Sequence, residues 1–146
     1  MSLDVYLVGA GSRPAGSGIF IREDGETREI SRADWDARFP DREPVVADYQ
    51  TEEVYSRNIT HNLGAMAEAA GIYRHLWRPD EIEIFQAAQL VAPLSAGLAA
   101  LTEDPDRFRA LNPSNGWGTY EGLVTFVADY LAACCANPQA TVKVSR

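Results

Sequence analysis

The chain has 146 residues, of which 46% are hydrophobic and 23% charged, a composition typical of one globular domain rather than of a disordered chain. Its 21 acidic residues outnumber the 13 basic ones, and the formal net charge of -8 repels phosphate backbones, which disfavours general nucleic-acid binding. No stretch reaches the roughly 20 apolar residues of a membrane helix. We therefore expect a single domain over residues 1–146 that has no contact with a membrane. Its two cysteines, Cys134 and Cys135, are adjacent and do not make a disulfide framework, which fits a cytoplasmic location.

The first third of the chain has the patterns of β structure. Leu3–Val8 alternates in side-chain character with a period of two, which predicts a strand. Two further strand-like runs, Ile19–Arg22 and Thr27–Ile30, flank an Asp24-Gly25 pair. Asp-Gly between such runs is a strong signal for a hairpin, so we expect these two strands to pair.

Shorter elements follow the hairpin. Ser31 is a suitable N-cap for a short helix over Arg32–Phe39, with Trp35 and Phe39 directed inward. Two short strands are predicted at Pro44–Ala47 and Glu53–Arg57. Loops are expected over residues 9–18 and 48–52.

From Thr60 onward the apolar residues recur with the period of a helix. The spacing predicts helices over residues 60–71, 84–101, 104–111 and 120–136. Gly71 is placed to end the first of them, and Pro93 predicts a kink or a break inside the second.

Residues 140–145 alternate again and predict a C-terminal strand that returns to the N-terminal one. The expected fold is therefore α+β. A small, mainly antiparallel sheet combines the N-terminal strand, the hairpin, the strand around Val54 and the C-terminal strand. Three or four helices cover one face of this sheet, because their apolar stripes need a common surface to bury.

Two segments concentrate amide, hydroxyl and aromatic groups at predicted helix starts, where unpaired backbone N–H groups gather. We expect the two segments to lie close together and to form the functional site. The candidate ligand-binding residues are Asn58, Thr60, His61, Asn62, Asn115, Trp117 and Tyr120. His61 would be the first candidate for proton transfer, since its side chain titrates near neutral pH.

A purely structural interpretation of the same residues stays open. In this interpretation Thr60 caps a helix, Asn58 holds a turn, and His61 and Asn62 are exposed to solvent. Trp117 either presents a stacking face to a planar ligand or fills the core.

Metal binding and a bound cofactor are not expected. His61 and His75 have no second ligand at a recognised spacing. The basic and aromatic run Tyr73–Arg78 has two interpretations: it contacts an anionic partner, or its Arg side chains pack over Trp77.

These observations leave three functions open. The first is a module that binds a small polar or anionic ligand at a helix N-terminus and the adjacent Trp loop. The second is an acidic interaction protein, of the inhibitor or immunity type, that covers a basic protein surface. The third is an enzyme that uses His61.

Several motifs resemble a family of small bacterial and bacteriophage proteins that has no established activity. They are the run Asn58–Leu63, the runs Ala70–Tyr73 and Leu76–Pro79, and the run Asn115–Tyr120. The similarity extends from about residue 54 to the end of the chain. It implies a shared fold, leaves a shared site open and implies no function.

Overall fold

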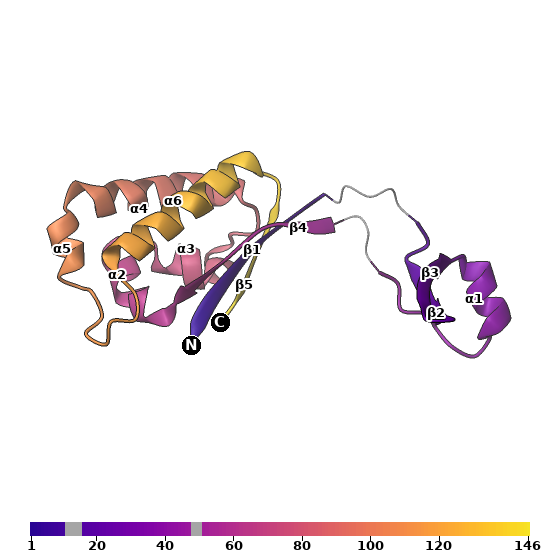
Figure 1. Cartoon of the computed structure of the whole chain (residues 1–146). Coiled ribbons are helices and arrows are strands. Elements are labelled where there is room, and N and C mark those ends of the chain that lie inside the picture. The colour runs from indigo at the N-terminus through magenta and orange to yellow at the C-terminus, as the bar shows by residue number, and fades with distance from the viewer. Residues whose placement is uncertain (11–15, 48–50) are drawn as a thin grey trace. The chain divides into compact units, whose positions relative to one another are not determined.

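The computed structural model describes residues 1–10, 16–47 and 51–146 (Figure 1). These residues form two compact units. The larger unit combines Met1–Gly9 with Glu53–Arg146, and the smaller unit is the segment Ala10–Glu52 between them. Each of the two loops predicted over residues 9–18 and 48–52 lies partly outside the described residues.

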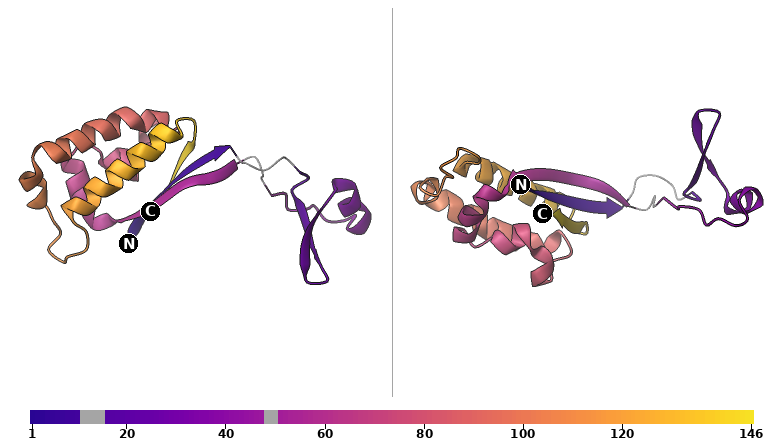
Figure 2. Two further views of the ribbon diagram at one scale, coloured as in Figure 1. Left: turned by 45° about the horizontal axis from the view of Figure 1, so that its top comes forward. Right: turned by 90° about the horizontal axis from the view of Figure 1, so that it is seen from below.

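Three strands form the sheet of the larger unit, in the order β4-β1-β5. β1 (Ser2–Ala10) pairs antiparallel with β5 (Thr141–Ser145), which confirms the predicted return of the C-terminal strand. The end of β4 (Thr51–Thr60) lies beside the start of β1, because the backbone N–H of His61 donates to the carbonyl of Met1 over 3.3 Å. Figure 2 shows β1 and β4 side by side in both views.

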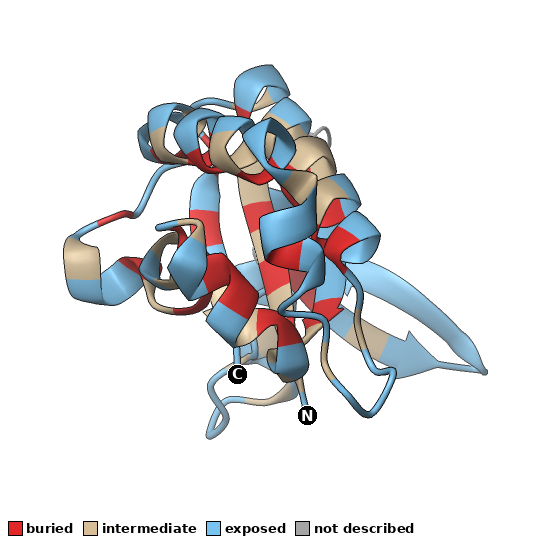
Figure 3. Cartoon of the chain, turned by 90° about the vertical axis from the view of Figure 1, so that its left-hand side faces the viewer, coloured by how far each residue is buried: buried red, intermediate tan, exposed pale blue. Residues whose placement is uncertain are grey.

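One face of the sheet is buried under helices. Leu3, Val5 and Leu7 of β1 are fully buried, whereas the side chains between them are only half-buried, so the predicted period of two is confirmed (Figure 3). Leu3, Val5 and Leu7 belong to one buried cluster with residues of the helices. Figure 1 shows these helices on one side of the sheet.

The helical part of the larger unit is continuous from the end of β4 to β5. Its elements are the short 3-10 helices η1 (His61–Leu63) and η2 (Pro79–Ile82) and the α-helices α2 (Gly64–Ala69), α3 (Tyr73–Trp77), α4 (Ala88–Glu103), α5 (Pro105–Arg109) and α6 (Tyr120–Ala136). Gly71 has a φ of 77°, as expected where a helical segment ends. None of the described helices is long and apolar enough to cross a membrane.

Helix α4 runs without a break through Pro93. The sequence predicted a kink or a break at this proline; the break is excluded, and the kink stays a prediction. Pro93 is the sixth residue of α4, so its missing N–H removes only the bond to the carbonyl of Gln89, while the following turns remain bonded. Leu90, Leu94 and Leu101 form the buried stripe that the spacing predicts.

The smaller unit contains the hairpin and one helix. β2 (Ile19–Glu23) and β3 (Glu26–Ile30) pair antiparallel as predicted, but they form a separate two-stranded sheet instead of joining the larger one. The two strands bury only Ile19 and Ile30, so the hairpin has little apolar surface to place on a shared core.

The remaining predicted elements of the smaller unit are reduced in the structure. The expected strand Pro44–Ala47 is a single bridge between Val46 and Ile19. Helix α1 (Arg32–Arg38) contains no buried residue. Trp35 and Phe39 were predicted to point into a core. They instead pack on each other at the surface of the unit, with ring centroids 4.6 Å apart.

Candidate functional site

The two segments singled out in the sequence meet in the structure. A Cβ atom added to Gly118 would lie 2.8 Å from the Cγ2 methyl of Thr60 and 2.9 Å from Cγ of Leu63. The loop before α6 therefore packs directly on the turn after β4. Gly118 has a φ of 106°, so both its backbone conformation and this close approach require glycine.

Polar side chains fix the loop that carries Trp117. The Oδ1 atom of Asn115 accepts the backbone N–H of Trp117 over 2.9 Å, and Oδ1 of Asn112 accepts that of Tyr120 over 2.8 Å. Thr119 caps α6 through its hydroxyl oxygen. These bonds use the side chains that would otherwise be available to a ligand, and they hold the loop in one conformation.

The indole of Trp117 is directed to solvent, with 68% of the residue exposed. It does not fill the core, although this is the usual place of a tryptophan. Leu111, in the same loop, is 41% exposed. Trp117 and Leu111 are the two exposed large hydrophobic residues of this loop, and we call the exposed part of the loop that carries them the Trp117 surface.

Tyr120 is placed differently from the other candidates. It is buried, its hydroxyl donates to the carbonyl of Leu101 over 2.7 Å, and its ring stacks on Phe108 with centroids 6.5 Å apart. Its side chain therefore links α6 to α4 and α5, and it is not accessible to a ligand.

The turn after β4 also satisfies its own polar groups. Thr60 caps η1 by accepting the N–H of Asn62 over 3.3 Å, and the N–H of His61 is bonded to Met1. The amide of Asn58 donates to Oδ1 of Asp4 over 2.7 Å. The N–H groups expected to attract an anion are therefore already occupied, and Asn62 is left exposed.

Both ring nitrogens of His61 are engaged inside the larger unit. Nδ1 accepts the indole N–H of Trp77 over 3.0 Å, and Nε2 lies 2.7 Å from the carbonyl oxygen of Ser2. These partners assign the neutral tautomer with the proton on Nε2. Because a proton on Nδ1 would displace the bond to Trp77, this geometry favours a structural role for His61 over proton transfer.

Two cavities formed by described residues have linings that include none of the seven candidate residues. One of about 400 Å³ lies between α2, α3 and the segment after η2, and one of about 280 Å³ lies between η2 and β5. The sequence analysis noticed Tyr73–Arg78 as a basic and aromatic run but did not predict a cavity beside it. Within the described parts of the chain, no group of three or more His, Cys, Asp or Glu side chains could hold a metal ion.

Comparison of the chain with protein-family models, curated proteins and solved structures found no match. The resemblance of the motifs to bacterial and bacteriophage proteins therefore stays a prediction.

Proposed function

We propose that the larger unit binds a partner protein through the Trp117 surface. The observation that carries this proposal is the exposure of Trp117 on a loop that is fixed by its own hydrogen bonds. Tryptophan is among the residues that contribute most to protein–protein binding, because it buries a large area and has few rotatable bonds. A loop that is already ordered loses little conformational entropy when the partner binds.

The same geometry gives less support to a small polar or anionic ligand at this place. The side chains of Asn58, Thr60 and Asn115 are bonded to other parts of the chain. An anion would have to compete with these internal bonds. An apolar indole beside satisfied polar groups instead has the composition of the centre of a protein interface.

The charge of the chain supports a basic partner. With a formal net charge of -8, long-range electrostatics accelerates encounter with a positively charged surface and slows encounter with an acidic one. The proposed function is therefore that of an acidic interaction protein with Trp117 as its apolar anchor.

The test is quantitative affinity capture from the organism that encodes the protein, with the wild type, Trp117→Ala and Phe85→Ala as baits. Phe85 is the matched control, because it is 57% exposed and lies outside the Trp117 surface. A protein retained by the wild type and by Phe85→Ala is expected to bind Trp117→Ala about 30-fold more weakly, which is the loss of ~2 kcal/mol typical of an interface anchor.

Two results would contradict this function. One is equal retention of the partner by Trp117→Ala. The other is a clear loss of stability in that variant, since truncation of an exposed side chain is expected to change the free energy of unfolding by no more than ~0.5 kcal/mol. Stabilisation by a nucleotide or sugar that disappears in Trp117→Ala would favour the small-ligand function in its place.

A further inference from the structure

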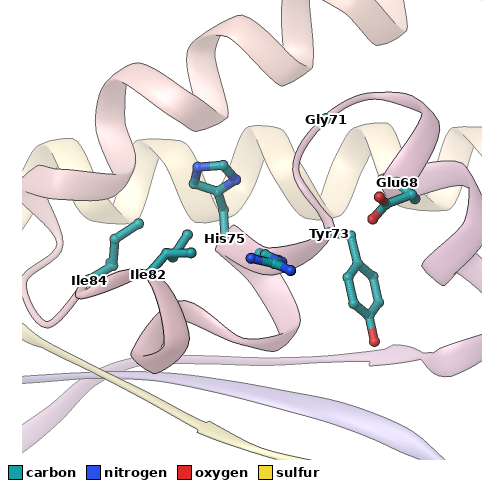
Figure 4. Close-up of a pocket in the computed structure, with 7 residues that line it drawn as sticks. Glu68, Gly71, Tyr73, His75, Ile82 and Ile84 are labelled. Atoms are coloured by element: carbon teal, nitrogen blue, oxygen red, sulfur yellow. The ribbon is translucent and has the colours of Figure 1, made fainter.

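The cavity of about 400 Å³ has the size of a small-molecule site, since such sites range from roughly 300 to 1,000 Å³. It lies beside α3 and is separate from the residues of the Trp117 surface. The side chains that line it and enter the argument are Glu68, Arg74, His75, Ile82 and Ile84. Figure 4 shows Glu68 on one side of the cavity, Ile82 and Ile84 on the other, and His75 between them.

The cavity has two charged side chains of opposite sign. Among the salt bridges formed by the described residues, none includes Glu68 or Arg74. Burial lowers the pKa of His75, so its imidazole is neutral at pH 7. One carboxylate and one guanidinium are therefore available to a bound molecule, and a ligand with a single charge would be repelled by one of them.

The opposite side of the cavity is apolar. Ile84 is 7% exposed and Ile82 is half-buried, and both line the cavity with hydrocarbon. The cavity is also open beside Gly71, where an added Cβ atom would meet nothing within 4 Å.

A polar atom of the lining lacks a bond. Nδ1 of His75 is buried and has no hydrogen-bond partner. Such groups are rare in folded proteins.

We propose that this cavity binds a free α-amino acid with an apolar side chain. The carboxylate of the amino acid pairs with Arg74, its ammonium group pairs with Glu68, and its side chain packs on Ile82 and Ile84. The two unpaired charges and the apolar wall are the three features that such a molecule matches at once, whereas a simple carboxylate or amine matches two of them.

The test is isothermal titration calorimetry of the full chain with three related probes at pH 7. L-leucine has all three features, L-leucinamide lacks the carboxylate, and 4-methylpentanoate lacks the ammonium group. We expect L-leucine to bind with a millimolar or tighter dissociation constant. Both analogues are expected to bind at least about tenfold more weakly, because each leaves one charged side chain unpaired.

Two substitutions assign the contacts. Arg74→Gln and Glu68→Gln remove one charge each from exposed side chains without an ion pair, so the fold is expected to persist, and each is expected to weaken L-leucine binding at least about tenfold. Glu103→Gln, an exposed carboxylate outside the cavity, is the matched control and leaves binding unchanged.

The proposal would be overturned by three results. They are no binding of L-leucine at millimolar concentration, equal affinity for L-leucine and 4-methylpentanoate, and unchanged L-leucine affinity in Arg74→Gln or Glu68→Gln. None of these results depends on Trp117, so they leave the proposed function untouched.

Discussion

His61 joins two parts of the larger unit through its two ring nitrogens. One nitrogen accepts from Trp77 at the end of α3, and the other bonds to Ser2 at the start of β1. Trp77 is 1% exposed, so its buried indole N–H loses its protein acceptor if the imidazole is removed. We therefore expect His61→Ala to lower the free energy of unfolding by about 1–3 kcal/mol, the cost of leaving a buried donor unsatisfied.

Urea denaturation checks this prediction, with Asn62→Ala as the neighbouring control. Asn62 is exposed, and its substitution is expected to change the free energy of unfolding by less than ~0.5 kcal/mol. His61→Ala should also lower the free energy of unfolding by less in a Trp77→Phe background. The effects of substituting two residues that share one hydrogen bond are not additive. Equal stability of the wild type and His61→Ala would show that the two bonds contribute nothing.

The candidate residues show what a sequence reveals of a site at the scale of single residues. The sequence left two interpretations of Thr60 open, a helix cap or a ligand-binding residue, and the structure shows its side chain capping η1. The sequence left open whether Trp117 fills the core or is exposed, and it did not show that Tyr120, the first residue of α6, is buried. The close approach of Gly118 to Thr60 and Leu63 is a tertiary contact, which the local sequence pattern does not show.

At the scale of elements, the local patterns predicted the strands of both sheets and the long helices α4 and α6, whereas α3 and η2 were not predicted. Helix α6 has the predicted bounds, Tyr120–Ala136, because a wide apolar face repeats over its length. Helix α3 has five residues, too few for a helical period to be recognised. The same limit applies to the site, since the 400 Å³ cavity is built around α3 and the segment after η2.

Substitution of two helical glycines by alanine is predicted to change the free energy of unfolding in different directions. The difference arises because α4 packs closely on Ile72, just before α3. Ala is preferred to Gly in a helix by ~1 kcal/mol. At Gly97, however, an added Cβ would overlap the Cγ2 methyl of Ile72. At Gly64 the nearest atom, Cε2 of Tyr73, is 3.4 Å away. We expect Gly97→Ala to destabilise by about 1–3 kcal/mol, the usual cost of overpacking, and Gly64→Ala to be neutral or stabilising.

Thermal and urea denaturation of the two variants compare these signs directly. Combining Gly97→Ala with Ile72→Ala should cost less than the sum of the single changes, because truncation of Ile72 makes room for the new methyl group. Stabilisation by Gly97→Ala would mean that α4 can move away from Ile72 at little cost.

At the scale of the whole molecule, the chain length predicted one domain, and the described residues form two compact units. The single-domain prediction stays open, because compact units can unfold together or separately. Sequence patterns predicted the hairpin of the smaller unit, but not that its two strands form a sheet separate from the three-stranded one. Strand periodicity specifies which side chains share a face, whereas sheet membership depends on how much apolar surface the strands have to share.

The larger unit is expected to fold without the segment between its two parts. Gly9 lies beside Val54, with 3.2 Å between an added Cβ and the Cγ1 methyl, so β1 and β4 are adjacent where the smaller unit is inserted. Replacement of residues 10–52 by Asn-Gly would join these antiparallel strands in a two-residue hairpin turn. The replaced segment buries only Ile19 and Ile30 of its described hydrophobic residues, so the core of the larger unit is unaffected.

The shortened chain is expected to be at least as stable as the full chain, because each halving of a loop lowers its closure cost by about 0.6 kcal/mol. Far-UV circular dichroism and urea denaturation measure this, and the expected result is one cooperative transition at an equal or higher urea concentration. A matched chain with the same deletion and a flexible Gly-Ser linker separates the effect of turn geometry from that of loop length. Loss of cooperative unfolding in both shortened chains would mean that the smaller unit is needed for the fold of the larger one, and that residues 1–146 form a single cooperative domain after all.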